Sequence, residues 1–504
     1  MPMHVPARRS TNPSTTPPIT PSTTQPITPL ITQSTPSTPS APLHRLLSST
    51  ADAVAAVRNG RSLTDVLAQV PADVRAGTQA LSFQVLRCLG GAEAVVALMA
   101  PKPPPPPVLS LLVTALALLW PGDAPPPYAD HTLVDQAVSA ARLRTPAAAN
   151  FVNALLRRFL RERAALVAQA QRSPVAAYNH PLWWIERLRH DWPGQWQALL
   201  AAANQHPPMV LRSNARRQTA AAYLASLAAA GRVAYPVADP LLHAQALVLA
   251  APCGVQDLPG FADGLVSVQD LSAQRAALLL LGGGNSGVPA LRPGARVLDA
   301  CAAPGGKTAH LLELADIHLL ALDSDARRLQ RVQDTLSRLH LPAAAAETAA
   351  DAANPPAQVT LHAADARAVA QWWDGRQFDA ILLDAPCTAS GIVRRHPDVR
   401  WLRRPDDVAT LAAIQRELLD ALWPLLAPGG RLLYATCSLF KAEGQQQIDA
   451  FLQRHARQSP RLDAASPGHL LCLPDNPALA ATSTAARPAL ATGDGFYYAL
   501  IHKP

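Results

Sequence analysis

The sequence is poor in cysteine and has no long apolar run. Only six of its 504 residues are cysteines, and none of them forms a C-x-x-C pair. This spacing argues against a structural zinc site and against the disulfide framework of a secreted protein. The first forty residues lack the apolar core of a signal peptide. The longest apolar run, Val108 to Trp120, has 13 residues, too few to cross a bilayer. We therefore expect a cytoplasmic protein with no membrane partner and no bound metal.

Charge is also scarce, and it is unevenly distributed between residue types. Charged residues make up 16% of the chain, and the 44 basic residues outnumber the 36 acidic ones. The net charge of +8 fits a polyanion such as nucleic acid, and a solvated basic surface explains it equally well. Only four basic residues are lysines, so a lysine inside a motif is informative. The apolar fraction of 49% is ordinary for a globular protein and allows a sizeable core.

An N-terminal tail and a helical domain are expected in the first third of the chain. From Ser10 to Pro42, 25 of 33 residues are Pro, Ser or Thr, so residues 1–43 have almost nothing to bury and are predicted to be a disordered tail. An organelle transit peptide has a similar composition and is the alternative. Residues 44–172 are predicted to be all-α, because segments such as 151–160 place apolar residues at helical spacing with arginines on the other side.

The remaining chain predicts a small linker domain and a larger α/β domain. Residues 173–262 combine closely spaced tryptophans, for which core packing is the expected role, with a Pro-Pro pair. Residues 263–504 alternate short apolar runs with helical patterns, as in a doubly wound, Rossmann-like sheet. The expected strands are 296–299, 317–322, 359–361, 380–383 and 432–434.

A glycine-rich turn follows the first of these strands. In Asp299-Ala-Cys-Ala-Ala-Pro-Gly-Gly-Lys-Thr308 the glycines let backbone N–H groups approach a ligand at a helix N-terminus, although the spacing is neither G-x-G-x-x-G nor a Walker loop. Asp323 and Asp365 end the next two strands. There, one acid can accept hydrogen bonds from ribose hydroxyls and the other can read an adenine amino group. A nucleoside cofactor without a phosphate-binding fingerprint indicates S-adenosylmethionine.

Two cysteine motifs follow the fourth and fifth strands. They are Asp384-Ala-Pro-Cys387 and Thr436-Cys437-Ser438. Either cysteine alone is best explained as an ordinary buried residue, but both are expected on the cofactor's side of the sheet. A thiolate that adds to carbon 6 of cytosine makes carbon 5 able to take a methyl group, and an acid such as Asp384 can stabilise the charge that develops on the ring. Two thiols beside a methyl donor therefore predict methylation of cytosine at carbon 5.

These motifs resemble the RNA cytosine-5 methyltransferases of the NOL/NOP/Sun family, in the branch that modifies bacterial 16S ribosomal RNA. The resemblance covers nearly the whole chain from about residue 44. It implies a NusB-like RNA-binding domain, a linker domain and a C-terminal α/β methyltransferase domain. The other segments that carry it are 151–158, 180–184, 204–212, 268–270, 394–398, 401–404 and 493–499.

The resemblance also implies a role for each motif residue. Cys437 is the implied nucleophile, and Cys387 is implied to assist release of the enzyme from the methylated base, with Asp384 as the third catalytic residue. The implied S-adenosylmethionine site consists of Cys301, Ala302, Ala303, Pro304, Gly305, Gly306, Lys307, Asp323, Asp365 and Asp384. The expected substrate is a cytidine of 16S ribosomal RNA, and we expect a monomer.

Two alternatives stay open at this point. The same chemistry on transfer RNA or large-subunit ribosomal RNA is the nearest one. A non-catalytic RNA-binding or antitermination factor is the alternative from another class, and the intact Cys387, Cys437 and Asp384 argue against it.

An arginine cluster follows the Cys387 loop directly, and we predict that it contacts RNA phosphates. Its members are Arg394, Arg395, Arg400, Arg403 and Arg404.

Overall fold

A computed structural model of the chain describes residues 41–122, 126, 128–341, 344–345, 359–473 and 493–504. Residues 41–504 form one compact unit. Of the predicted tail, residues 1–40 lie outside the described residues. The predicted domain limits after residues 43, 172 and 262 stay predictions.

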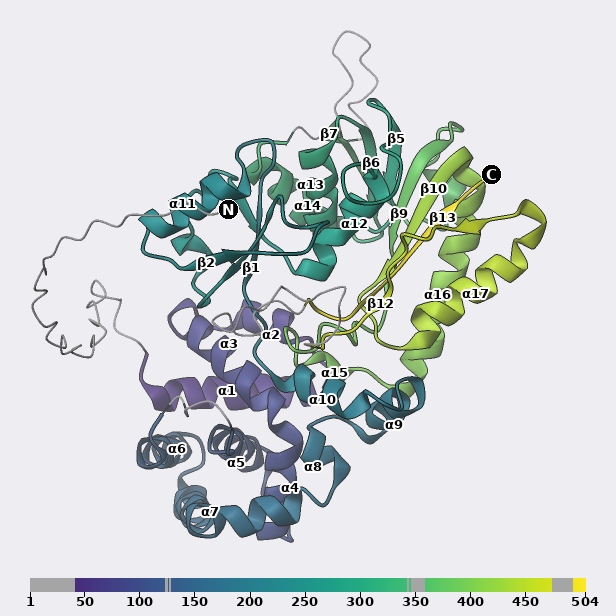
Figure 1. The fold of residues 1–504 in the computed structure, drawn as a ribbon. Helices are drawn as coiled ribbons and strands as arrows, with labels where there is room; N and C mark the ends of the chain where they lie inside the picture. Colours follow the sequence, from purple (N-terminus) through teal and green to yellow (C-terminus); the bar gives the residue numbers. More distant parts are fainter. Residues whose placement is uncertain (1–40, 123–125, 127, 342–343, 346–358, 474–492) are drawn as a thin grey trace, which may run out of the picture. The chain divides into compact units, whose positions relative to one another are not determined.

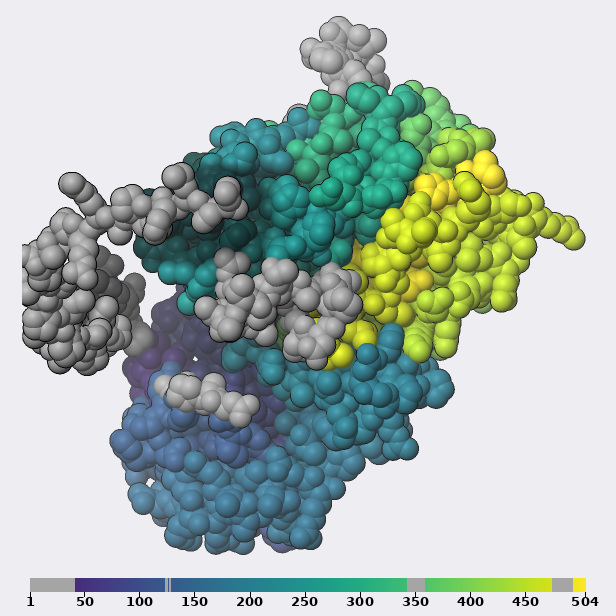
Figure 2. Space-filling model, in the orientation of Figure 1, coloured from purple at the N-terminus to yellow at the C-terminus, as the bar shows by residue number. Residues whose placement is uncertain are grey.

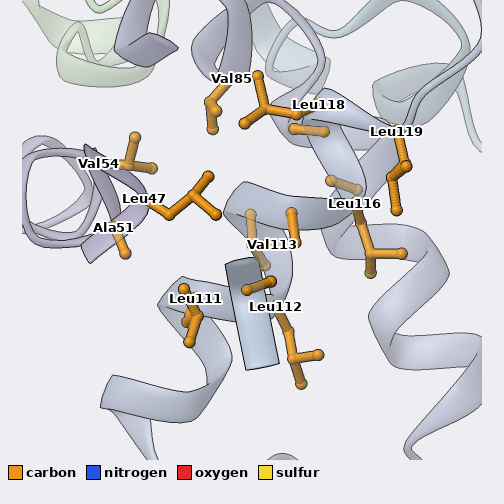
Figure 3. Close-up of a cluster of buried hydrophobic side chains, with 14 of the residues drawn as sticks. Leu47, Ala51, Val54, Val85, Leu111, Leu112, Val113, Leu116, Leu118 and Leu119 are labelled. Carbon is orange, nitrogen blue, oxygen red and sulfur yellow. The ribbon is translucent and has the colours of Figure 1, made fainter. Parts of the chain in front are cut away.

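The N-terminal domain is helical, as its apolar periodicity predicts (Figure 1). Its helices are α1 (Leu43–Arg58), α2 (Leu63–Gln69), α3 (Ala72–Arg87), α4 (Leu89–Met99), α5 (Pro106–Leu118), α6 (Asp130–Arg144) and α7 (Ala149–Ala170). Helix α5 starts with two prolines, which the first turn tolerates because its N–H groups have no partner within the helix. It is apolar on all sides and packs against α1, α3, α4, α6 and α7, so it forms the centre of this core. Figure 3 shows side chains of α1 and α3 gathered around it.

The linker begins with three short helices and continues into an antiparallel sheet. The helices are α8 (Pro174–Tyr178), α9 (Leu182–Asp191) and α10 (Trp196–Asn204). The strands are β1 (Val210–Ser213), β2 (Ala234–Pro236), β3 (Ala246–Leu249) and β4 (Val266–Val268), in the order β2-β3-β1-β4 and covered by α11 (Ala220–Ala229). Trp184 is buried against Phe440 with 5.1 Å between ring centroids, which confirms its expected role in core packing.

The C-terminal domain contains a mostly parallel sheet in the order β11-β13-β10-β9-β5-β6-β8-β7. Its strands are β5 (Arg296–Asp299), β6 (His318–Asp323), β7 (Ala344–Ala345), β8 (Val359–Ala363), β9 (Phe378–Asp384), β10 (Leu426–Thr436), β11 (Arg461–Leu462), β12 (Gly468–Leu470) and β13 (Phe496–His502). Its α-helices are α12 (Leu271–Leu281), α13 (Gly306–Leu314), α14 (Ala326–Arg338), α15 (Val399–Leu402), α16 (Pro405–Leu422) and α17 (Gln445–Arg454). All the predicted strands are present. Strand β13 lies between β11 and β10 and runs antiparallel to β10.

Side chains alternate between the two faces of this sheet and build a core on each. Val297 and Leu382 pack with α12, α13 and α14, whereas their neighbours Leu298 and Leu383 pack with α16 and α17. Figure 1 shows these two groups of helices on opposite sides of the sheet. The doubly wound, Rossmann-like architecture predicted from the sequence is therefore confirmed.

The topology creates a switch point beside β5. From β5 the chain moves outward through β6 and β8 on one side, then returns to β9 and continues to β10 on the other. In such sheets ligands bind at the carboxyl ends of the strands, next to the point where the order reverses. Figure 2 shows the later segments, including α17 and β13, gathered on one side of the view in yellow-green and yellow.

Within the described ranges no single helix is both long and apolar enough to cross a membrane. Helices α3 and α4 reach that length and apolar character only together, and they are bent by 70° relative to each other.

Candidate active site

The glycine-rich turn connects β5 to α13 at the switch point. Gly305 has a φ of 99°, in the left-handed region that favours glycine, and a Cβ there would come within 3.0 Å of the Cα of Val332. Thr308, in the first turn of α13, donates a hydrogen bond of 2.7 Å to Asp299 at the end of β5. The turn is thus fixed at both ends, with the N-terminus of α13 at the carboxyl edge of the sheet.

Asp299 is fully buried beneath this turn. Its second carboxylate oxygen, Oδ1, has no hydrogen-bond partner, and burial raises the pKa of the group to about 7. A buried acceptor without a donor is costly, so a donor brought by a ligand at the turn would relieve that cost.

Asp323 connects the turn to the second strand. Its carboxylate is 3% exposed and accepts hydrogen bonds from the backbone N–H groups of Ala303, at 3.2 Å, and Asp325, at 3.1 Å. Ala364 donates its N–H to the carbonyl of Asp323, which places the start of the Asp365 loop directly beside it. The predicted cofactor residues from the first three strands are therefore neighbours.

Asp365 is the most solvent-accessible of these acids. It forms an ion pair of 2.7 Å with Arg367, and this hydrogen bond lowers the pKa of the Asp365 carboxyl. Arg367 also pairs with Glu417 of α16, and a shallow depression lies beside all three side chains.

Lys307 and Asp384 form an ion pair between the turn and the end of β9. The distance from Nζ to Oδ2 is 2.5 Å, and the lysine also lies 5.4 Å above the ring of Phe496. Burial favours the neutral amine, but the charge and hydrogen bond of Asp384 outweigh it and raise the pKa of Lys307 above its ordinary value. The lysine is therefore an ammonium ion that neutralises Asp384.

The two cysteine motifs meet at the carboxyl ends of β9 and β10. The Sγ atoms of Cys387 and Cys437 are 3.5 Å apart, and both residues are free thiols. Gly391 donates its N–H to the carbonyl of Cys437, which joins the two loops through their backbones. The hydrogen bond with Cys437, burial and the charge of Glu443 all raise the pKa of Cys387 well above its ordinary value.

The arginine cluster after Cys387 is largely internal, and the predicted phosphate contacts are wrong for Arg394 and Arg400, which are buried. Arg394 and Arg395 both pair with Asp494, which is fully buried, and Arg395 also pairs with Asp270. Arg400 is fully buried and bonds to residues of the linker. These cations satisfy buried carboxylates and carbonyls, so they are not free to bind RNA.

Arg403 and Arg404 complete the cluster. Arg403 donates hydrogen bonds of 3.2 Å to the carbonyls of Cys387 and Thr388, so it supports the catalytic loop. Arg404 is exposed, and its phosphate contact stays a prediction.

Two residues of the site were not anticipated from the sequence. Glu443 is fully buried and accepts hydrogen bonds from both cysteine loops. Arg212 of β1 is also fully buried; it pairs with Glu313 of α13 and donates to the carbonyl of Gly306. Their partners lie in other segments of the chain, and no local pattern marks either residue. The one available signal for Arg212 was an arginine directly after apolar residues, in Met209-Val210-Leu211-Arg212.

The donor set around the turn fits S-adenosylmethionine. It offers backbone N–H groups at the start of α13, an acid at the end of β6 for ribose hydroxyls, and the unpartnered oxygen of Asp299 for a donor on the ligand. Among the described residues no group of three or more His, Cys, Asp or Glu side chains is placed to hold a metal ion.

Comparison with known proteins supports this interpretation. Residues 288–502 match the family described as 16S rRNA methyltransferase RsmB/F, and residues 180–256 match its ferredoxin-like domain. Ribosomal RNA small subunit methyltransferase B of Pseudomonas syringae is 41% identical over 467 residues, which cover 90% of this chain and 96% of the relative. The protein of that name from Vibrio cholerae is 44% identical over 381 residues, 74% of this chain and 77% of its own length.

Solved structures share the fold. The crystal structure of PH0851 has a TM-score of 0.67 at 23% identity and covers 91% of this chain and 99% of its own. A methyltransferase homologue from Pyrococcus horikoshii has a TM-score of 0.50 at 25% identity and covers 66% of this chain and 97% of its own. The linker is thus a ferredoxin-like domain, and the resemblance inferred from the motifs is confirmed. The methyl donor is S-adenosyl-L-methionine, and the chain belongs to the 16S rRNA methyltransferase RsmB/F family.

Proposed function

We propose that this protein methylates carbon 5 of a cytidine in 16S ribosomal RNA through a covalent cysteine–base adduct. The observation that carries the proposal is the pair of thiols 3.5 Å apart, at the strand ends next to the cofactor turn. A methyl donor alone would suit many acceptors. Carbon 5 of cytosine is special because it becomes nucleophilic only after a thiolate has added to carbon 6.

The two thiols differ in accessibility, and this difference supports their separate roles. Cys437 is partly exposed at the end of β10, whereas Cys387 is buried. Because its pKa is raised, Cys387 stays a thiol and can donate its S–H toward a thiolate at Cys437. We therefore assign Cys437 as the nucleophile and Cys387 as the residue that assists release of the product.

The chemistry then follows from these residues. The thiolate of Cys437 forms a bond to carbon 6, and the electron pair of the C5–C6 double bond becomes available at carbon 5 as an enamine. Bound S-adenosylmethionine supplies the electrophilic methyl group that carbon 5 takes. A water molecule at the partly exposed site then takes the proton from carbon 5. The electron pair of the C5–H bond restores the C5–C6 double bond, and the C6–S bond breaks to release the Cys437 thiolate. The thiol of Cys387 lies where it can stabilise that departing sulfur.

Asp384 and Lys307 serve the base at the same time. Addition at carbon 6 pushes electron density toward the ring nitrogen, so a proton supplied to that nitrogen lowers the barrier. Asp384 would deliver the proton as the neutral acid after taking it from the ammonium of Lys307, 2.5 Å away. The ion pair with Lys307 fixes the orientation of the Asp384 side chain at the cofactor turn. One pair of charges thereby connects the base site to the cofactor site.

The choice of RNA rests on the relatives, which are named for ribosomal RNA of the small subunit. The basic helix α7 and the linker offer the surface that would select it. The test is to incubate the purified protein with 16S ribosomal RNA lacking its modifications and with S-adenosylmethionine carrying a labelled methyl group. We expect label in 5-methylcytidine after digestion to nucleosides. Label in another nucleoside would refute the proposed chemistry, and label only with transfer RNA or 23S RNA would refute the proposed substrate.

A further inference from the structure

The loops that carry the two cysteines share one buried carboxylate. We propose that Glu443, in the turn before α17, is a positioning residue that holds Cys387 and Cys437 at their working separation. The proposal rests on the proposed function, because it assigns the separation of the thiols a role in the reaction. Glu443 follows Cys437 by six residues.

The carboxylate of Glu443 accepts hydrogen bonds from both loops, two from the Cys387 loop and one from the Cys437 loop. Oε1 accepts a hydrogen bond of 2.8 Å from the backbone N–H of Thr388, the residue after Cys387. Oε2 accepts hydrogen bonds from the Thr388 hydroxyl at 2.5 Å and from the hydroxyl of Ser438, the residue after Cys437, at 2.6 Å. A single carboxylate therefore binds both residues that directly follow the two cysteines.

A second layer keeps this carboxylate in place. Gln415 of α16 donates to Oε1 at 3.3 Å, and the hydroxyl of Tyr434 donates to the backbone carbonyl of Glu443 at 2.8 Å. Ser390 and Ser438 are within 2.9 Å of each other, which adds a direct contact between the loops. The arrangement has donors for both oxygens, as a buried carboxylate requires.

Two substitutions distinguish a positioning role of Glu443 from an effect of its negative charge. A glutamine in place of Glu443 can keep the N–H of Thr388 on its oxygen and donate its amide to the two hydroxyls, which can rotate to accept. An alanine removes the bridge and leaves the Thr388 N–H without its acceptor. If Glu443 acts through position, E443Q keeps the function of the site and E443A loses it.

The test measures the thiol separation without any RNA or cofactor. The full-length wild type, E443Q and E443A are treated with diamide, and the rate of the Cys387–Cys437 disulfide is followed by mass spectrometry of unreduced peptides. We expect E443A to form the disulfide at least about tenfold more slowly than wild type, because a disulfide requires a narrow range of Cβ–Cβ distances. The rate in E443Q should stay within about threefold of wild type. The negative charge beside Cys387 is lost in both variants, so the charge alone predicts faster oxidation of both.

Two controls isolate the effect. L112A, in the core of the helical domain, creates a cavity far along the chain from the cysteines and should leave the disulfide rate unchanged despite its lower melting temperature. Asp449→Ala removes an exposed carboxylate from α17 and should also behave as wild type. A slow disulfide in L112A would show that general destabilisation explains E443A and would overturn the proposal.

Activity on 16S ribosomal RNA is the second readout. We expect kcat of E443A to fall by about a hundredfold, the scale of a misplacement near 1 Å, and kcat of E443Q to fall by less than about fivefold. Wild-type disulfide rates in E443A, or equal losses in E443Q and E443A, would overturn the positioning role. Absence of cytosine methylation by the wild type would refute the proposed function and leave the disulfide measurement able to judge Glu443.

Discussion

At the scale of single residues, the site is organised by buried or half-buried charges that are paired across segments. Lys307 faces Asp384, and Arg394 and Arg395 face Asp494. Each charge compensates a partner that would be costly to bury alone. The Lys307–Asp384 pair differs from the arginine pairs because it lies between the cofactor turn and a cysteine loop.

Asp384→Asn tests the catalytic role of this pair. The substitution keeps the shape of the side chain and removes the acid, so we expect kcat to fall by about 10²- to 10³-fold, the usual cost of losing one group that stabilises developing charge. The measurement is the initial rate of methyl transfer at saturating RNA. Asp406→Asn, an exposed aspartate of α16, is the control and should keep wild-type activity. If the double variant K307M/D384N had the wild-type rate, the only role of Asp384 would be to pair with Lys307.

The catalytic motifs could be found from sequence because their residues are contiguous. Asp384 and Cys387 lie in one loop, and Lys307 lies in the glycine-rich turn. The buried arginines were misread for the opposite reason. Arg394 is paired with a carboxylate a hundred residues further along the chain, and a run of arginines in sequence carries no sign of that partner. The partner of Arg212, Glu313, is also about a hundred residues away in the sequence, so it could not be recognised from a local pattern.

At the scale of elements, the loops after β9 and β10 are held by close backbone contacts. Gly391 donates its N–H to the carbonyl of Cys437, and Gly495, just before β13, donates to the carbonyl of Gly391. A Cβ on Gly391 would lie 2.0 Å from the carbonyl oxygen of Gly495. Only glycine permits this approach, so the residue fixes the height of the Cys387 loop above the sheet.

Gly391→Ala is therefore expected to push the Cys387 loop away from β13. We predict a loss of stability of about 1–3 kcal/mol, typical of overpacking, together with a larger loss of methylation activity. Urea unfolding and initial rates are the two measurements. Gly194→Ala provides the comparison, because nothing lies within 4 Å of the Cβ it would add. Unchanged activity in G391A would show that the loop does not depend on this close approach.

The ferredoxin-like sheet is attached to the cofactor helix by a fully buried ion pair. Arg212 on β1 and Glu313 on α13 have no exposed side-chain surface, and their separation is 2.8 Å. Arg212→Met should destabilise the protein by about 3–5 kcal/mol, because it leaves a buried carboxylate without a partner. The double variant R212M/E313M should recover most of this loss. Thermal unfolding measures these changes in stability. The control is R158A, which removes an exposed ion pair on α7 and is expected to cost less than about 1 kcal/mol.

The elements of the α/β domain were predictable because their signals are local. Strands such as β5 and β9 are short, buried apolar runs, and α14 has a strong apolar stripe at Val332 and Leu336. The order of the strands and the pairing of the linker sheet depend on contacts between distant segments. Those contacts leave no periodic pattern in the sequence.

At the scale of the whole molecule, the helical domain is joined to the Cys387 region by buried polar contacts. Arg87 donates to the carbonyl of Arg394 at 2.6 Å, and the indole N–H of Trp401 donates to the carbonyl of Leu86 at 2.9 Å. The segment that follows the Cys387 loop is thus also the segment that contacts the N-terminal domain. RNA bound to the helical domain would be held in a defined place relative to the two thiols.

Helix α7 is the candidate for that RNA interaction, since Arg157 and Arg161 are exposed on it. We predict that R157A/R161A weakens RNA binding and reduces the slope of log K against log salt by about 0.7–0.9 for each phosphate that the protein no longer neutralises. Binding titrations at several salt concentrations measure this slope. The charge-conserving R157K/R161K variant should restore it. An unchanged slope in R157A/R161A would place the RNA elsewhere.

The central claim is that Cys437 attacks the base and Cys387 releases it. The most direct measurement is a denaturing gel of C387A, C437A and wild type after reaction with 16S ribosomal RNA and S-adenosylmethionine, with C253A in the linker as control. The account predicts a stable protein–RNA adduct with C387A, no adduct and no methylation with C437A, and wild-type turnover with C253A. A stable adduct with C437A instead would reverse the assignment of the two thiols, and no adduct with either variant would contradict covalent catalysis.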